Sequence, residues 1–166
     1  MEIRHTSTED IDRVMAVFEQ AKRFMRLNGN FRQWTGGYPS REILEADISQ
    51  ESSFVCIDDD GAIVGTFCFR YGVEPEPTYR TIYNGAWLND KPYGVIHRIA
   101  SSGKVGGVFA TCLAFCGEFV DNIRIDTHRD NRVMQELLGR HGFSRCGIIY
   151  LVNGDERIAF QKEISR

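Results

Sequence analysis

The feature that most constrains this sequence is a buried strand that runs into a glycine-rich turn and then into an apolar helix. Residues 93–101 are largely apolar, residues 103–107 read Gly-Lys-Val-Gly-Gly, and residues 108–119 are apolar and of helix length. A helix start has unpaired N–H groups and the positive end of the helix dipole, and glycines let a ligand approach the backbone. The segment is therefore typical of a phosphate-binding site, and a plain strand-to-helix connection is the alternative.

The spacing of this turn excludes two familiar phosphate motifs. Gly103, Gly106 and Gly107 do not follow the G-x-G-x-x-G spacing of dinucleotide-binding turns. Lys104 is not preceded by the glycine pattern of a Walker loop. The turn alone therefore does not identify the ligand.

The rest of the chain alternates between strands and helices. Thr6-x-x-Glu9 reads as a capping box, and residues 58–61 and 153–154 read as hairpin turns. The expected strands are 2–5, 54–57, 62–71, 93–101, 122–127, 146–152 and 156–164, and the expected helices are about 7–28, 40–49, 108–119 and about 130–141. This order predicts an α/β (α+β) fold with a mixed sheet. A length of 166 residues with no linker predicts a single domain over 1–166.

The order of elements, the glycine turn and a later motif together resemble the GNAT superfamily of acetyl-CoA-dependent N-acetyltransferases, over nearly the whole chain. The family motif Asn-x-x-A-x-x-x-Tyr-x-x-x-Gly-Phe is similar to the segment that begins at Asn131 and ends at Gly142 and Phe143. Leu138 stands where the family has its tyrosine, which often protonates the departing thiolate. The resemblance implies a mostly antiparallel sheet of about seven strands flanked by about four helices.

The resemblance also implies acetyl-CoA as the cofactor, with coenzyme A as the product. The family's pyrophosphate loop, R/Q-x-x-G-x-G/A, falls on residues 102–107, where Gly107 matches and Ser102 and Val105 depart. The cofactor would lie between the strands at 93–101 and 122–127. The implied contacts are Ile99, Ala100, Ser101, Ser102, Gly103, Lys104, Val105, Gly106, Gly107 and Asn131.

The chemistry of acetyl transfer to an amine requires a base, because a lysine-like amine is protonated at neutral pH. His97 lies on the strand expected to flank the acetyl group and is the candidate base, and a hydrogen-bonded core histidine is the alternative. Strand alternation predicts that Arg98 points to the opposite face. Arg98 would anchor an acidic group of the substrate or pair with a carboxylate.

The acceptor would be a small-molecule or peptide amine. The family usually places its acceptor pocket in the first two helices and their loop, which here holds Gln33, Trp34 and Tyr38. Trp87, in the irregular segment 72–92, is a further candidate for contact with the acceptor. These aromatic residues would line the pocket or, as the alternative, seal the edge of the core. The departures at Ser102, Val105 and Leu138 leave a non-catalytic acyl-CoA-binding or regulatory module as the alternative function.

Composition excludes several other classes of protein. A formal net charge of -3 with no basic stripe speaks against nucleic acid as a partner. No window approaches the ~18 apolar residues of a membrane span, and the first residues, Met-Glu-Ile-Arg-His, do not form an apolar signal-peptide core, so a cytoplasmic protein is expected. Five cysteines without a Cys-x-x-Cys pair do not suggest disulfides or a zinc site. Cys112 and Cys116 read as packing residues, and a redox or metal protein that uses these two cysteines is the alternative. A homodimer is left open.

Overall fold

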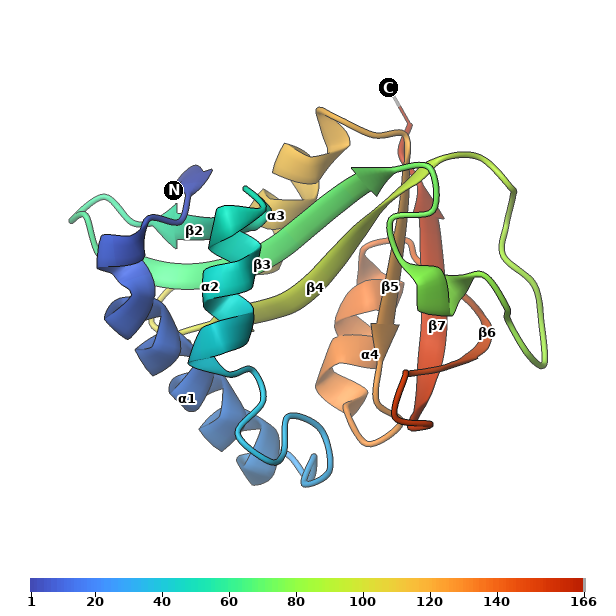
Figure 1. The fold of residues 1–166 in the computed structure, drawn as a ribbon, viewed down its shortest axis with the longest axis horizontal. Coiled ribbons are helices and arrows are strands. Elements are labelled where there is room, and N and C mark those ends of the chain that lie inside the picture. Colours follow the sequence, from blue (N-terminus) through green and yellow to red (C-terminus); the bar gives the residue numbers. More distant parts are fainter. Residues whose placement is uncertain (166) are drawn as a thin grey trace.

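One mixed sheet organises residues 1–165, which the computed structural model describes (Figure 1). Its seven strands are ordered β1-β2-β3-β4-β5-β7-β6, and only β4 and β5 are parallel neighbours. The strands are β1 (Glu2–His5), β2 (Ser53–Ile57), β3 (Ile63–Gly72), β4 (Tyr93–Ser101), β5 (Asn122–Thr127), β6 (Ser144–Tyr150) and β7 (Glu156–Glu163). The α-helices are α1 (Ile11–Leu27), α2 (Arg41–Ser49), α3 (Val108–Gly117) and α4 (Arg132–Arg140). The predicted fold class is confirmed.

Most predicted elements agree with the structure to within two residues, and one predicted cap is wrong. The capping box at the start of α1 begins at Ser7, not at Thr6, because the carboxylate of Asp10 accepts a hydrogen bond from Ser7 N at 2.8 Å. The hydroxyl of Thr6 instead pairs with the Ser53 hydroxyl at 2.8 Å. Thr6 is therefore buried between β1 and β2 rather than capping a helix.

The parallel pair β4–β5 separates soon after it forms. Its register contains only Gly94 with Ile123 and Val95 with Arg124. Figure 1 shows the two strands diverging beyond this point. The edge of β4 that faces β5 therefore carries backbone N–H and C=O groups with no strand partner from residue 96 onward.

A bulge in β4 lies opposite β3 at the same level. Cys68 pairs with His97 and Thr66 pairs with Ala100, so β4 has one extra residue between these pairs. Arg98 takes up the bulge with a φ of 51°, in the left-handed region that β-strand residues avoid. The bulge breaks the alternation of side chains along β4, and the prediction that Arg98 points away from His97 is wrong.

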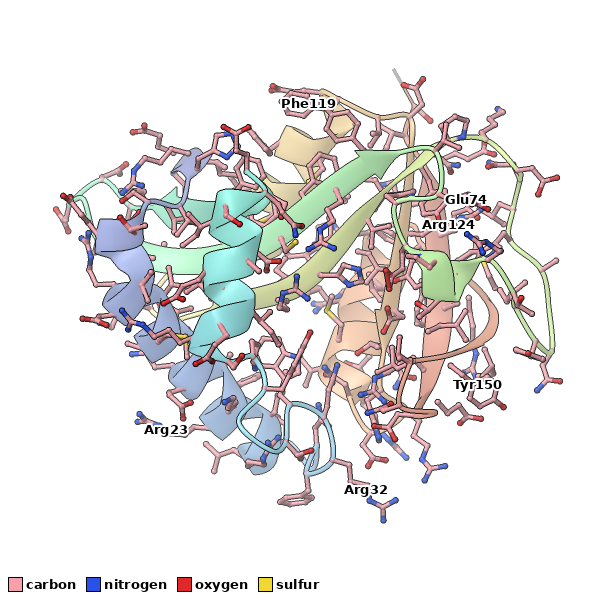
Figure 2. All side chains as sticks on the ribbon, in the orientation of Figure 1. Arg23, Arg32, Glu74, Phe119, Arg124 and Tyr150 are labelled. Carbon is pink, nitrogen blue, oxygen red and sulfur yellow. The ribbon has the colours of Figure 1, made fainter. Side chains whose placement is uncertain are left out.

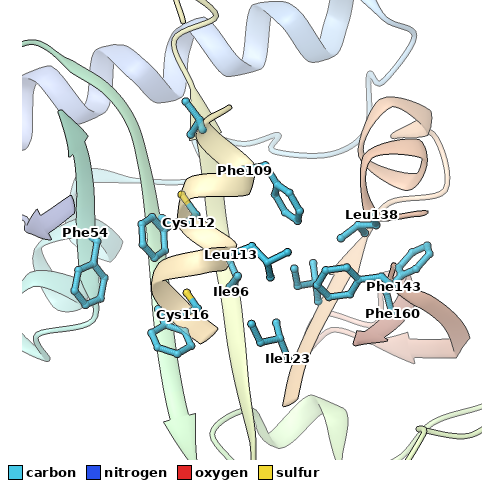
Figure 3. Packing of buried hydrophobic residues seen from close by; sticks show 14 of the residues in the cluster. Phe54, Ile96, Phe109, Cys112, Leu113, Cys116, Ile123, Leu138, Phe143 and Phe160 are labelled. Carbon is cyan, nitrogen blue, oxygen red and sulfur yellow. The ribbon is translucent and has the colours of Figure 1, made fainter. Parts of the chain in front are cut away.

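The two faces of the sheet are covered by different helices. On the α3/α4 face, side chains of both helices pack on the sheet in one apolar cluster, which includes Phe67, Cys112 and Leu138 (Figure 3). On the α1/α2 face, a smaller cluster lies beneath the two helices and another lies around Tyr79, in the irregular segment 72–92. No helix within residues 1–165 is long and apolar enough to cross a membrane.

Candidate active site

A cavity of about 550 Å³ lies where β4 and β5 diverge. Side chains from both faces of the sheet line it: His97 belongs to the α1/α2 face, whereas Ile96 and Ile125 belong to the apolar cluster of the α3/α4 face. The other lining residues used below are Arg32, Gln33, Trp34, Tyr38, Asp47, Arg70, Glu76, Arg98, Ile99, Asp126, Thr127, Asn131, Asn153, Asp155 and Arg157. This cavity, called here the central cavity, thus lies at the gap between the separating strands and is reached by side chains of both faces.

His97 faces a carboxylate across the central cavity. Its Nε2 atom lies 3.8 Å from Glu76 Oε2, within ion-pair range, and both side chains are 18% exposed. The other carboxylate oxygen of Glu76 accepts a hydrogen bond from Thr78 Oγ1 at 2.9 Å. Burial alone would raise the pKa of Glu76, but His97, Thr78 and the charge of Arg70 outweigh it and hold this pKa below its usual value. Glu76 is therefore an anion at neutral pH.

A second carboxylate lies on the same side of the cavity. Asp126 Oδ2 accepts a hydrogen bond of 2.6 Å from the hydroxyl of Tyr79, whose ring centroid is 6.3 Å from that of His97. Tyr79 is fully buried, and burial together with the charge of Asp126 raises its pKa well above the usual value. Tyr79 therefore stays protonated and orients Asp126. The surroundings of His97 are acidic, which suits a cationic amine.

Asp47 of α2 holds two arginines at the other side of the cavity. Its carboxylate accepts hydrogen bonds from Arg98 Nε at 2.8 Å and Nη2 at 2.7 Å, and from Arg70 Nη2 at 3.0 Å. Arg98 Nη1 also donates to the hydroxyl of Tyr38 at 3.2 Å. Of the two predicted roles for Arg98, pairing with a carboxylate is what the structure shows.

The loop between α1 and α2 is held in place by the side chain of Arg26 on α1, which binds backbone carbonyl groups of the loop. Arg26 donates to the carbonyl oxygens of Asn30, Gln33 and Trp34, each at 2.9 Å. The Trp34 ring then packs edge-on against Tyr38, with centroids 6.4 Å apart. Gln33, Trp34 and Tyr38, the residues predicted for an acceptor pocket, all line the cavity.

Asn131 begins α4 and connects this loop to the other wall. Its Oδ1 atom caps the helix by accepting from Met134 N at 3.1 Å. Its Nδ2 atom donates to Gln33 Oε1 at 2.9 Å. Close by, Thr127 presents a buried hydroxyl that has no hydrogen-bond partner among the described residues. A ligand with amide groups fits this wall, because such groups can satisfy both Thr127 and the unpaired edge of β4.

The glycine turn lies at the start of α3, beyond the lining of the cavity. Gly107 caps the helix with a φ of 81°, and a Cβ atom added at Gly103, Gly106 or Gly107 would meet no heavy atom within 4 Å. Thr111 N is the first α3 amide to bond within the helix, to Gly107 O at 3.0 Å, so three earlier N–H groups have no helical partner. This open turn fits a pyrophosphate group such as that of acetyl-CoA.

The remaining residues predicted around this turn have identifiable local roles. The hydroxyl of Ser101 accepts from Gly103 N at 3.1 Å, and that of Ser102 accepts from Lys104 N at 3.2 Å, so both shape the turn. Lys104 is exposed, and Val105 packs against the α3/α4 cluster. Ile99 lines the cavity, and Ala100 packs beneath the first two helices.

Trp87 lies outside the central cavity. Its indole Nε1 donates to Tyr79 O at 2.9 Å, and the guanidinium of Arg124 lies 4.2 Å from the Trp87 ring centroid and 4.1 Å from that of Tyr93. Trp87 thus packs in a separate aromatic stack, which corresponds to the alternative reading of a residue that seals the core.

Leu138 and the cysteines belong to the apolar core. Leu138, at the position of the family's tyrosine, is fully buried under α4. Cys112 and Cys116 are fully buried as well, and Cys112 Sγ lies 3.6 Å from Cys56 Sγ. Their position in the core agrees with the prediction that these cysteines are packing residues.

The arrangement of fold and site can be compared with known proteins. No family model and no curated protein matches the sequence. Among solved structures, a GNAT-family acetyltransferase from Streptococcus agalactiae is 32% identical with a TM-score of 0.86, and the match covers 99% of this chain and 96% of that chain. The chain therefore belongs to the GNAT superfamily of acetyltransferases.

More distant structures share the fold. A putative acetyltransferase from Staphylococcus aureus is 23% identical with a TM-score of 0.69, covering 99% of this chain and 100% of that chain. A ribosomal-protein-alanine N-acetyltransferase from Brucella melitensis is 19% identical with a TM-score of 0.64, again covering 99% and 100%.

Sequence reasoning missed several residues of the central cavity, Glu76 above all. Glu76 lies in the irregular segment 72–92, between Pro75 and Pro77, where no periodicity links it to a strand. The two prolines restrict the backbone around it, which was the one available signal that this carboxylate has a fixed position. Asp47 and Arg70 were missed for a different reason, since each alone reads as an ordinary polar residue on a helix or strand.

Proposed function

We propose that this protein transfers the acetyl group of acetyl-CoA to a primary amine. The observation that carries the proposal is the central cavity between β4 and β5, which is lined by His97, Glu76, Thr127 and Asn131. The open glycine turn lies beyond this lining, at the start of α3. A donor entering from the α3/α4 face and an acceptor entering from the α1/α2 face would meet at the gap.

The donor side is supplied by groups that suit coenzyme A. The open turn at Gly107 would receive the pyrophosphate, and the unpaired edge of β4 would hydrogen-bond the amide-containing arm. Acetyl-CoA supplies an acetyl group already activated as a thioester. N–H groups on the same edge would stabilise the negative charge that develops on the thioester oxygen during attack.

The acceptor side is supplied by His97 and two carboxylates. Glu76 and Asp126 would draw the ammonium form of the acceptor toward His97, which would take one proton and leave a neutral amine. The amine nitrogen then forms a bond to the carbonyl carbon, the carbon–sulfur bond breaks, and the second proton that the nitrogen loses neutralises the departing thiolate. Because a thiol of this kind has a pKa of about 8.5, the thiolate can leave without the tyrosine that Leu138 replaces.

Two measurements together test the proposal. Calorimetric titration with acetyl-CoA should show binding, and a panel of small amines and peptides should release free coenzyme A thiol with formation of the acetylated amine. No binding at millimolar acetyl-CoA would remove the donor from the proposal. Binding without turnover of any amine would favour the non-catalytic acyl-CoA-binding module, which the buried Leu138 also allows.

A further inference from the structure

Arg157, near the start of β7, is a buried cation that has no ion pair. Its side chain lies in the wall of the central cavity, and the residue is only 8% exposed. Among the described residues, no carboxylate oxygen lies within 4.0 Å of its guanidinium, and its one hydrogen bond is from Nη1 to Glu156 O at 2.9 Å. A guanidinium has five N–H donors, so most of this donor capacity is unused. The Arg157 nitrogens without a hydrogen bond are not among the fully buried unpaired polar atoms, so they face the cavity, where an anionic ligand can reach them.

Arg98 differs from Arg157 in having a carboxylate partner. Arg98 lines the same cavity, and its guanidinium donates three hydrogen bonds, two to the carboxylate of Asp47 and one to the hydroxyl of Tyr38. Asp155 also lies on the cavity near Arg157 in sequence, but it is exposed and its carboxylate accepts from Asn153 Nδ2 at 3.1 Å. The protein therefore neutralises one buried arginine of the cavity and leaves the other open.

Further positive charge gathers around Arg157. Arg32, on the loop after α1, also lines the cavity and is exposed (Figure 2). This positive charge affects His128. Its pKa is lowered first by burial and then by the charge of Arg157, Arg129 and Arg32 contribute less, and Asp130 offsets part of the effect. His128 is therefore neutral at pH 7 and does not compete with Arg157 for an anion, but accepts from Asp130 N at 2.9 Å.

We propose that Arg157, assisted by Arg32, binds an anionic group on the acceptor, so that the acceptor is an amine that also carries a carboxylate or a phosphate. This inference rests on the proposed function, which places the amine beside His97. β5 alone separates β4 from β7 in the sheet, so the amine and the anion would be separated by roughly 10 Å, two strand spacings, or more because β4 and β5 diverge at this level. The acidic residues Glu76 and Asp126 hold the cationic end and Arg157 holds the anionic end, which fixes the direction in which the acceptor binds.

The test compares paired acceptors that differ only in charge. The probes are ω-amino carboxylates from glycine to 6-aminohexanoate against their carboxamides, and 2-aminoethyl phosphate against ethanolamine. For at least one pair, kcat/KM for the anionic member should exceed that of the neutral one by about 10- to 100-fold, as charge-assisted hydrogen bonds usually contribute. The carboxylate and phosphate arms show which anion is preferred.

Variants assign the preference to Arg157. In Arg157→Gln the ratio within each pair should fall to near one, and Arg157→Lys should restore part of it. The readout is the ratio within each pair rather than the absolute rate, because Arg157 lines the cavity, and an unchanged KM for acetyl-CoA would show that the donor site is intact. Arg145→Gln, at an exposed arginine of β6 outside the cavity, is the matched control and should keep the full preference. Equal rates within every pair in the wild type, or a preference that survives in Arg157→Gln, would overturn the inference.

A binding measurement separates this inference from the proposed function. If no amine is acetylated, the same probes are titrated calorimetrically into wild type and Arg157→Gln. Tighter binding of the anionic members, lost only in Arg157→Gln, would support the anion site while the transferase proposal fails. Equal affinities for charged and neutral members would overturn the anion site whatever the enzyme assay shows.

Discussion

The two faces of the sheet use their buried residues in opposite ways. The α3/α4 face is one continuous apolar cluster, with side chains such as Phe67, Leu113 and Leu138 packed on each other. The α1/α2 face has two smaller clusters with the central cavity between them, and there the buried side chains include Asp47 and Arg157. Burial on the first face yields stability, whereas on the second it fixes charged groups at the cost of their hydration. Substitutions should therefore separate stability from activity according to the face.

The largest loss of stability is expected for Phe67→Ala on the α3/α4 face. Phe67 is 1% exposed and stacks against Phe54 with ring centroids 5.3 Å apart. The substitution should lower the free energy of unfolding by about 3–5 kcal/mol in urea denaturation, because it leaves a cavity in the core. Phe119→Ala, at a side chain that is 47% exposed, is the control and should cost under about 1 kcal/mol. Similar losses for the two variants would contradict the role given to this face.

The same contrast explains how much the sequence predicts. The bounds of β4 and β5 are correct because β4 is a largely apolar run and β5 alternates apolar with charged residues, and the helices follow from their periodicity. Arg98 is placed on the wrong face because alternation assumes a regular strand, and a bulge depends on the register with β3, which no local pattern records. Glu76 meets His97 only through tertiary packing of an irregular segment. The apolar packing can thus be predicted from the sequence, whereas the charged site depends on contacts between residues far apart in the sequence.

Asp47→Ala tests whether charge also stabilises the α1/α2 face. The substitution leaves Arg98 and Arg70 beside each other without their carboxylate, and Arg98 is only 12% exposed. We expect a loss of about 3 kcal/mol in the free energy of unfolding, with a raised KM for the acceptor amine, because Arg98 also positions Tyr38. Glu45→Ala, an exposed carboxylate on the same helix, should change neither quantity appreciably. Unchanged stability in Asp47→Ala would mean that the arginines find other partners.

A smaller, pH-dependent effect is expected where α1 begins. Hydrogen bonds from Arg4 outweigh the effect of burial and, with those from Ser7, lower the pKa of Asp10 from 3.8 to about 2. A carboxyl group with a lower pKa in the folded state stabilises the fold above the unfolded pKa, and this contribution is lost as the pH falls through the folded value. Asp10→Asn should therefore cost about 1–2 kcal/mol at pH 7, less than the full shift implies because Arg4 is partly exposed.

The pH dependence provides the check on Asp10. The difference in the free energy of unfolding between wild type and Asp10→Asn should be constant above about pH 4 and should vanish toward pH 2. Asp12→Asn, at a neighbouring exposed carboxylate, should show a far smaller difference at any pH. A difference in the free energy of unfolding that is the same at pH 7 and pH 2 would show that the charge of Asp10 does not stabilise the start of α1.

The central claim is that His97, on the α1/α2 face, acts as the base in acetyl transfer. Its most direct test is the kcat of His97→Ala. At saturating acetyl-CoA, we expect kcat for amine acetylation to fall by about 100- to 10,000-fold, the usual contribution of a general base. Acetyl-CoA affinity and the free energy of unfolding should stay near the wild-type values, and His5→Ala, at an exposed histidine of β1, should keep full activity. A kcat for His97→Ala that equals the wild-type value would contradict the claim.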